Sequence, residues 1–280
     1  MYLVKTRAIL SLHDKAGLEA FARSLVSSGM EVLASGGTAK AVEGAKIAVT
    51  KIESVTGFPE ILGGRVKTLH PMVHGGILGR PADPAHAAEM KKLGIVPVRV
   101  VAVTLYPFED VARRARTENV DEAELIENID IGGVALIRAA AKNHESVYVV
   151  VDGADFDAVA IAAAGAFDTK LARRLAVKAF AHTAAYDALI AQTLGERAGA
   201  GVSDRVEFPE TLTLSYRRAQ ALRYGENPHQ AAAFYFDPVR PVATEQLHGK
   251  ELSYNNILDV DAAWRLVSEF RDPGAVIVKH

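Results

Sequence analysis

The 280-residue sequence contains no cysteine. This absence excludes a disulfide framework, a thiolate zinc site and a cysteine nucleophile, and it fits a reducing compartment such as the cytoplasm. An excess of charge of one sign is also missing, because 32 Lys and Arg face 34 Asp and Glu and leave a formal net charge of -2. No overall field draws the molecule to nucleic acid or to a membrane surface, so any recognition of an anion must be local.

Long apolar runs are absent as well. Residues 1–7 lack the apolar core of a signal peptide, and no run approaches the roughly 20 apolar residues that a bilayer span needs. Hydrophobic residues nevertheless make up 49% of the chain, which is enough for the core of one large or two ordinary domains. The sequence therefore predicts a soluble cytoplasmic protein with no membrane or nucleic-acid partner.

Apolar runs and helical periodicities alternate along the first two thirds of the chain. This alternation predicts an α/β domain over residues 1–197, with a mostly parallel sheet flanked by helices and ligands bound at the carboxyl ends of the strands. The expected strands are residues 7–12, 30–34, 47–52, 96–105 and 146–151. The expected helices include residues 18–25, 38–44, 84–93, 122–128, 134–141 and 168–194.

The sequence changes character after a stretch rich in Gly, Ala and charge. We predict a linker over residues 198–210 and a second, α+β segment over residues 211–280. The expected strands there are 211–216, 231–236 and 275–278, with a helix over 259–270. About 70 residues make a marginal independent core, so this segment reads as the beginning of a domain.

The most informative stretch is Gly63 to Pro71, Gly-Gly-Arg-Val-Lys-Thr-Leu-His-Pro. It combines the cations Arg65 and Lys67 with the hydroxyl of Thr68 between glycines, and Pro71 is expected to keep the segment from continuing as a helix. Fixed cations, a hydroxyl and exposed amides suit a phosphate. The structural alternative is a solvated basic turn.

Two further turns of the same character lie upstream. Residues 11–17 and 35–38 supply Lys15, the hydroxyls of Ser11, Ser35 and Thr38, and the amides of Gly36 and Gly37. Amides at helix starts favour anions because the helix dipole is positive there. Three such turns on one sheet favour a phosphorylated small molecule as the ligand.

Three more residues could reach the same cleft. Tyr106, Asp130 and Lys142 each end a strand or border a helix. Each also has a purely structural interpretation. Tyr106 could pack on Pro107, Asp130 could be an N-cap, and Lys142 could stabilise the C-terminus of a helix. A regular helix from 130 to 142 would separate its ends by roughly 18 Å. Either that helix breaks early, or Asp130 and Lys142 touch opposite ends of a long ligand.

Several long motifs in a fixed order resemble a known family. The first group resembles the inosine monophosphate (IMP) cyclohydrolase domain of the bifunctional purine biosynthesis proteins: Ser-Gly-Gly-Thr at 35, Thr-Gly-Phe-Pro-Glu at 56, Gly-Arg-Val-Lys-Thr-Leu-His-Pro at 64, His-Gly-Gly-Ile-Leu at 74, Leu-Tyr-Pro-Phe at 105, Glu-Asn-Ile-Asp-Ile-Gly-Gly at 127 and Ala-Ala-Lys-Asn-His at 140. The second group resembles the start of the aminoimidazole carboxamide ribonucleotide (AICAR) transformylase: Arg-Tyr-Gly-Glu-Asn-Pro-His-Gln at 223, Leu-Ser-Tyr-Asn-Asn at 252 and Val-Lys-His at 278.

The resemblance implies a methylglyoxal-synthase-like fold and a specific reaction. The first domain would close the ring of 5-formamidoimidazole-4-carboxamide ribonucleotide (FAICAR) to IMP with loss of water, without a cofactor or a metal. By resemblance, the residues around the reacting groups are Lys67, Tyr106, Asp130 and Lys142. Those toward the phosphate are Lys15, Ser35, Gly36, Gly37, Thr38, Arg65 and Thr68, to which the turn chemistry adds Ser11 and, beside the ring, Gly132 and Gly133.

Our allocation of roles within that reaction is a hypothesis. Asp130 assists deprotonation of the amide that attacks the formyl carbon, and Tyr106 relays a proton to the departing hydroxyl. Lys142 or a backbone amide near Gly132 stabilises the oxyanion, while Lys67 holds the nucleotide.

The second group of motifs carries a different expectation. In the family, residues that match Arg223, Tyr224, Asn256, Lys279 and His280 contact the aminoimidazole nucleotide, and 10-formyltetrahydrofolate is the cosubstrate. We expect this chain alone to have no transformylase activity, because the remainder of that pocket is missing from the sequence. Family members form homodimers, so self-association is expected.

Two rival functions and a metal site stay open. Methylglyoxal-synthase-like domains also serve as non-catalytic, regulatory nucleotide-binding modules, although the joint presence of the four ring-side residues disfavours this reading. Lyases that eliminate phosphate from a triose phosphate share the fold but lack the motif at 223. His70, His74 and His86 could bind a metal by composition, but their spacing matches no ligand pattern.

Overall fold

The computed structural model describes residues 6–198, 210–239 and 246–279. It divides into two compact units, with the boundary between Thr211 and Leu212. The linker expected at 198–210 lies almost entirely outside the described residues, so the domain limits drawn from the sequence stay a prediction. Each unit is described by itself.

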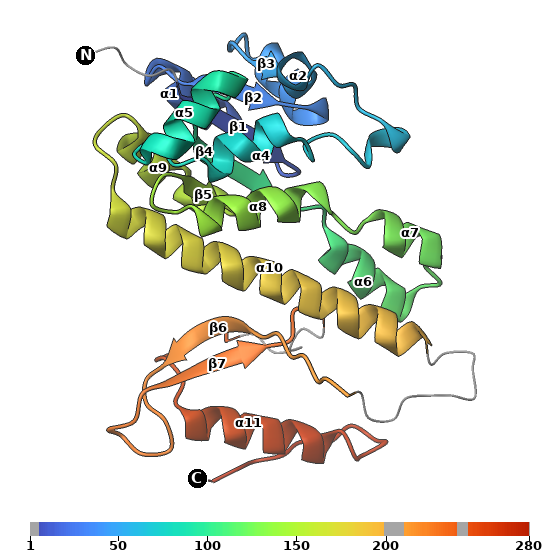
Figure 1. Ribbon diagram of the computed structural model, residues 1–280. Coiled ribbons are helices and arrows are strands. Elements are labelled where there is room, and N and C mark those ends of the chain that lie inside the picture. Colours follow the sequence, from blue (N-terminus) through green and yellow to red (C-terminus); the bar gives the residue numbers. More distant parts are fainter. Residues whose placement is uncertain (1–5, 199–209, 240–245, 280) are drawn as a thin grey trace. The chain divides into compact units, whose positions relative to one another are not determined.

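Unit 1 is built on a five-stranded, wholly parallel sheet with the order β3-β2-β1-β4-β5 (Figure 1). The strands are β1 (Arg7–Leu12), β2 (Glu31–Ala34), β3 (Thr50–Lys51), β4 (Val98–Thr104) and β5 (Tyr148–Val150). Parallel strands buried on both faces read as continuous apolar runs, and the sequence of β4, Val-Arg-Val-Val-Ala-Val-Thr, shows this pattern. The predicted α/β fold is confirmed.

Ten helices and two short 3₁₀ turns connect these strands in the described part of unit 1. The helices are α1 (Leu18–Ser27), α2 (Gly36–Gly44), α3 (Ile52–Thr56), α4 (Pro71–Leu78), α5 (Pro84–Leu93), α6 (Phe108–Thr117), α7 (Glu122–Glu127), α8 (Gly132–Lys142), α9 (Phe156–Ala163) and α10 (Thr169–Ala198). The 3₁₀ turns are η1 (Leu62–Gly64) and η2 (Gly153–Asp155). The long helix α10 lies along α8, as Figure 1 shows.

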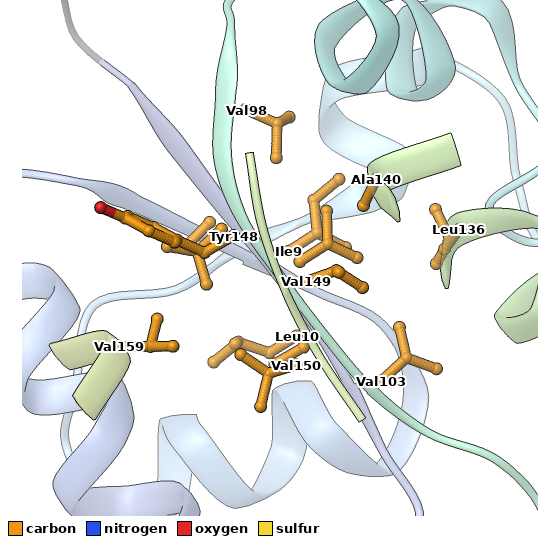
Figure 2. Packing of buried hydrophobic residues seen from close by; sticks show 14 of the residues in the cluster. Ile9, Leu10, Val98, Val103, Leu136, Ala140, Tyr148, Val149, Val150 and Val159 are labelled. Carbon is orange, nitrogen blue, oxygen red and sulfur yellow. The ribbon is translucent and has the colours of Figure 1, made fainter. Parts of the chain in front are cut away.

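The core lies on both faces of the sheet, because successive strand residues point to opposite sides. Figure 2 shows Ile9 and Val149 on the side of the α8 residues Leu136 and Ala140. The neighbouring strand residues Leu10 and Val150 lie on the other side with Val159 of α9. All of these side chains are almost completely buried. Two packed layers thus hold the carboxyl ends of the strands in fixed positions.

Some expectations about unit 1 need correction. The strand predicted at 47–52 is reduced to Thr50–Lys51, and Ile52 already begins α3. Pro71 does not stop a segment but opens α4, where its missing N–H costs no hydrogen bond. Asp130 lies one residue before the N-cap position of α8, which is Ile131, but from there its Oδ1 accepts the N–H of Gly133 at 2.7 Å and caps the first turn.

Unit 2 contains a hairpin and one helix among its described residues. Strands β6 (Arg217–Leu222) and β7 (Ala232–Phe236) pair antiparallel, and α11 (Tyr254–Val267) follows. The strand predicted at 211–216 is wrong. The strand of this region is β6, at Arg217–Leu222, because these are the residues that pair with β7. Residues 275–278 form no strand, since no described strand pairs with them. The helix starts earlier than predicted because Ser253 and Asn256 form a capping box at its N-terminus.

Candidate active site

A cavity of about 590 Å³ lies at the carboxyl ends of β1, β2 and β4. The strand order reverses direction between β1 and β4, and open α/β sheets bind ligands at such a switch point. The volume is in the range of small-molecule sites. The lining residues come from all three predicted turns, from the end of β4, from the last turn of α7 and from the start of α8 with the residues before it. They are Ser11, Leu12, His13, Lys15, Ser35, Gly36, Gly37, Thr38, Gly63, Gly64, Arg65, Lys67, Thr68, Thr104, Tyr106, Ile126, Glu127, Ile129, Asp130, Ile131, Gly132 and Gly133.

The first wall of the cavity joins the end of β1 to the start of α2. The buried hydroxyl of Thr38 accepts the N–H of Leu12 and donates to its carbonyl, each at 3.1 Å. Lys15 folds back so that its ammonium donates to the carbonyls of Leu12 and His13. Burial lowers the pKa of Lys15, and the nearby Asp14 opposes that shift. The wall is therefore a fixed surface that carries a cation.

The start of α2 points its free amides at this cavity. Ser35 precedes the helix in an extended conformation, and its side chain makes no capping hydrogen bond. The N–H groups of the first helical turn, including Gly36 and Gly37, have no partner within the helix. Together with the helix dipole they form an anion site, with the Ser35 hydroxyl beside it.

Arg65 and Lys67 face the cavity from the loop after η1, and each is paired with a carboxylate. Arg65 forms an ion pair with Glu127 of α7, and both side chains are largely exposed. Lys67 contacts Glu60 at 3.1 Å. Exposed ion pairs contribute little stability, so an incoming anion can replace Glu127 beside Arg65 at small cost. Gly64 is required beside this pair: its φ is +98°, and a Cβ there would lie 2.6 Å from Oε1 of Glu60.

Asp130 occupies the opposite side of the cavity, just before α8. The backbone N–H groups of Gly133 and Tyr106 donate to its carboxylate. Burial nevertheless raises the pKa of Asp130 above the ordinary value of 3.8, against the smaller effects of those hydrogen bonds and of the Lys67 charge. A partly buried carboxylate with a raised pKa is suited to accept a proton.

The cavity closes tightly around Asp130. A Cβ on Gly133 would lie 2.5 Å from Oδ2 of Asp130, and one on Gly132 would lie 3.0 Å from Oγ1 of Thr68. Tyr106 is 48% exposed, with its ring edge-on to His13 at a centroid distance of 5.8 Å. Its phenol is thus open to a ligand in the cavity.

Lys142 is not brought to this cavity. Helix α8 is regular from Gly132 to Lys142, so the early break considered from the sequence does not occur. Lys142 is the last residue of that helix and is exposed. At about 1.5 Å per residue the helix places it roughly 15 Å from Gly132. Its position in the last turn is the one at which a lysine stabilises the helix dipole.

Sequence reasoning did not select nine of the lining residues. They are Leu12, His13, Gly63, Gly64, Thr104, Ile126, Glu127, Ile129 and Ile131. The sequence does offer a signal for Thr104, because it is a hydroxyl residue at the end of an apolar strand. Its Oγ1 accepts the N–H of His13 at 2.6 Å and so shapes the turn after β1. The pairing of Glu127 with Arg65 spans 62 residues and has no local signal in the sequence.

The residues of unit 2 that the resemblance singles out make local contacts. The guanidinium of Arg223 lies 4.8 Å from the ring centroid of Tyr224. Oδ1 of Asn256 accepts from the N–H of Ser253 in the capping box. Lys279 is exposed, and His280 lies outside the described residues.

Two of the three histidines considered for a metal accept backbone N–H groups. Nδ1 of His70 accepts the N–H of Met72 at the start of α4, and Nδ1 of His86 accepts the N–H of Arg80. Burial lowers the pKa of His74. Within the described ranges, no cluster of three or more histidine, aspartate or glutamate side chains is arranged to hold a metal. Likewise, none of the described helices has the length and apolarity to cross a membrane.

The parallel sheet and its switch-point cavity, which Lys15, Arg65 and Lys67 line, define an α/β domain with a site suited to a small anion. Comparisons with known proteins specify the class. Residues 17–135 match the model of the MGS-like domain. Residues 140–280, half of the chain, match the model of the AICARFT/IMPCHase bienzyme. The chain belongs to the AICARFT/IMPCHase bienzyme family.

Curated relatives support the same assignment. The chain is 51% identical to the bifunctional purine biosynthesis protein PurH of Lactiplantibacillus plantarum, over 98% of its own length and 52% of that protein. The PurH proteins of Bacillus cereus (strain AH187) and Listeria innocua are 49% and 50% identical, with 54% and 53% of their lengths covered. The chain therefore spans about half the length of these relatives.

A solved structure resembles the fold. The crystal structure of ForH superposes with a TM-score of 0.60 at 34% sequence identity, covering 68% of this chain and 97% of ForH.

Proposed function

We propose that unit 1 is an IMP cyclohydrolase that closes FAICAR to IMP and releases water. The observation that carries this proposal is a single cavity with two different ends. One end has cations and the amides of α2, and the other has the partly buried carboxyl of Asp130 beside the phenol of Tyr106. A ribonucleotide has a matching division, with a phosphate at one end and a reactive base at the other.

The phosphate lies at the α2 end. The amides of Gly36 and Gly37 and the hydroxyl of Ser35 donate to its oxygens, and Lys15 and Arg65 neutralise its charge. The hydroxyls of Ser11 and Thr68 and the ammonium of Lys67 extend this grip along the ribose toward the base. Arg65 reaches the phosphate by giving up its exposed ion pair with Glu127 and forming an exposed ion pair with the phosphate.

The reaction needs orientation and two proton movements. The carboxamide nitrogen attacks the formyl carbon, a C–N bond forms, and Asp130 accepts the proton that the nitrogen loses. The former formyl oxygen becomes an oxyanion and then a hydroxyl. Asp130 supplies the proton that makes this hydroxyl, which leaves as water once Tyr106 has delivered a second proton to it. The formamide nitrogen gives its proton to the Tyr106 phenolate as the ring C=N bond forms, and the attacking nitrogen keeps its other proton. Atoms balance as FAICAR giving IMP and water.

The oxyanion is stabilised by the start of α8. Because Lys142 lies outside the cavity of a single chain, our proposal assigns this role to the amide of Gly132, a residue of the first helical turn. Asp130 already occupies the neighbouring amide of Gly133, which holds the base beside the oxyanion donor. The start of α8 therefore positions both the Asp130 carboxylate and the amide of Gly132.

The test is to incubate the purified protein with FAICAR and to measure IMP by chromatography. We expect turnover above the uncatalysed rate, whereas its absence would contradict the proposal. As the base, Asp130 must be ionised, so kcat is expected to fall as the pH is lowered through its raised pKa. The fall should therefore begin at a higher pH than that of an ordinary aspartate.

Formyl transfer from 10-formyltetrahydrofolate is not part of the function proposed for this chain. The family includes that activity, and residues 140–280 match its model. We expect an assay with AICAR and the formyl donor to give no product above the blank; product would overturn this expectation. We also propose that the chain forms a homodimer, which light scattering after size-exclusion chromatography would measure.

A further inference from the structure

Tyr186 of α10 holds the segment that carries Asp130. Its hydroxyl accepts the backbone N–H of Asp130 at 2.8 Å and donates to the backbone carbonyl of Asn128 at 3.2 Å. Asn128 and Asp130 lie in the short connection between α7 and α8. One phenol therefore fixes two backbone groups of this connection to a helix from a distant part of the sequence.

The phenol is itself held rigidly. The ring of Tyr186 is half-buried and meets the ring of Phe108 edge-on, with centroids 6.1 Å apart. Burial raises the pKa of Tyr186 to about 12, with the charges of Asp130 and Asp187 acting in the same direction and the hydrogen bond from Asp130 against it. The hydroxyl thus keeps its proton at neutral pH and continues to donate to Asn128.

Tyr186 does not line the 590 Å³ cavity, so it does not touch the ligand there. It lies behind Asp130, in a second hollow of about 380 Å³ that both residues line. The connection is then fixed from two sides: the backbone by Tyr186, and the carboxylate by the amides of Gly133 and Tyr106. Removing the phenol would release only the backbone side.

We propose that Tyr186 is a positioning residue of the ring closure, which holds the Asp130 carboxylate at the correct distance from the attacking nitrogen. This inference rests on the function proposed for the cavity. A base that is displaced by about 1 Å loses much of its effectiveness, whereas binding of the nucleotide through its phosphate is unaffected. Tyr186 should therefore influence kcat and not KM.

The experiment compares Tyr186→Phe with a matched control in the full chain. The control is Tyr148→Phe. The hydroxyl of Tyr148 also accepts a backbone N–H, that of Asp168 at 2.6 Å, but Tyr148 lies on β5 and does not line the cavity. Tyr186→Phe loses two hydrogen bonds to the backbone and Tyr148→Phe loses one, so both variants should show a fall in Tm. Tyr186→Phe should reduce kcat on the order of 10-fold with KM changed less than about twofold. Tyr148→Phe should keep kcat within about twofold.

A double substitution tests whether Tyr186 acts through Asp130. If it does, adding Tyr186→Phe to Asp130→Asn should change the residual kcat by less than about twofold. The same 10-fold loss in both backgrounds would overturn the inference, and so would a kcat for Tyr186→Phe equal to that of Tyr148→Phe. No turnover by the unsubstituted protein would instead overturn the proposed function.

Hydrogen exchange provides a second measurement that does not depend on the variant folding. In the unsubstituted protein the amide of Asp130 should exchange slowly, because its N–H donates a hydrogen bond to the Tyr186 hydroxyl. Fast exchange of this amide would overturn the inference whatever the kinetics of the variants.

Discussion

The two units differ in how much of their apolar surface they bury. Unit 1 has a continuous core on both faces of its sheet. In unit 2, α11 has no buried residue, and Trp264 and Phe270 are each 59% exposed. Both units match the same family, yet among the described residues only unit 1 has a core and a cavity that its own strands and helices complete. The described residues of unit 2 thus bury much less apolar surface than those of unit 1.

This difference follows from size and topology. The strands of unit 1 pair with one another and are covered by helices, so each apolar face finds a partner. A two-stranded hairpin with one helix offers too few faces, and such small assemblies are at best marginally stable in water. The site of unit 1 depends on strands that pair with one another and are covered by helices, because its groups come from three strand ends and two helix starts.

Separating the units should have the largest effect. Residues 1–211 expressed alone should unfold cooperatively and should retain the cyclohydrolase turnover of the full chain, because the core and the cavity lie within them. Residues 212–280 alone should show no cooperative thermal transition by circular dichroism. A cooperative transition in the second fragment would show that the contrast in burial does not control folding.

Matched leucines on a helix of each unit should show a smaller difference. Leu136 of α8 is fully buried, whereas Leu258 of α11 is 52% exposed. Leu136→Ala should lower the free energy of unfolding by about 2–5 kcal/mol, through lost burial and the cavity that remains. Leu258→Ala should change it by less than about 0.5 kcal/mol. Chemical denaturation of both variants in the full chain measures this, and equal losses would contradict the described burial.

Glutamates of the two units should differ in their effect on anion binding. Glu127 pairs with Arg65 in the cavity, so Glu127→Gln should leave Arg65 available and lower the Kd for IMP by about two- to fivefold. Glu269→Gln, an exposed position in unit 2, serves as the control and should leave Kd unchanged. Titration calorimetry would reveal the difference. Weaker binding in Glu127→Gln would mean that Glu127 contacts the ligand.

Two exposed lysines should show the smallest effects. Lys142 ends α8 outside the cavity, and Lys250 is exposed in unit 2. Replacing either by Met should change the kcat of cyclisation by less than about twofold, since neither reaches the reacting atoms. A loss in Lys142→Met as large as that in Asp130→Asn would show that Lys142 enters a cavity from a second copy of the chain.

Local patterns predicted the sheet and most of the cavity. Apolar runs indicated the strands at 7–12 and 96–105, and turns rich in glycine and hydroxyls identified Lys15 and Ser35 at the strand ends. Parallel strands bring such ends together, so the convergence of these residues followed from topology. The motif at 64–71 indicated Arg65 and Lys67 although it follows η1 and not a strand.

Features that depend on distant partners could not be predicted. Glu127 reaches Arg65, and Tyr186 reaches Asp130, across 62 and 56 residues, and no periodicity records such contacts. The strand expected at 211–216 has good alternation, but its place is taken by β6 because strands are selected by their partners. The position of Lys142 depended on whether α8 stayed regular, which its alanine-rich sequence favours. The motifs alone left an early break and a regular helix both open.

The most direct test of the account is the initial rate of purine-ring formation from FAICAR, followed by absorbance for the unsubstituted protein and for Asp130→Asn, with Kd for IMP measured on both. Asn keeps a side-chain oxygen to accept the N–H of Gly133, so the cap and the cavity are preserved. We predict a loss of kcat of about 10²–10³-fold with Kd changed less than about threefold. Equal losses in kcat and binding, or an unchanged kcat, would show that Asp130 is a structural cap and would contradict the proposed mechanism.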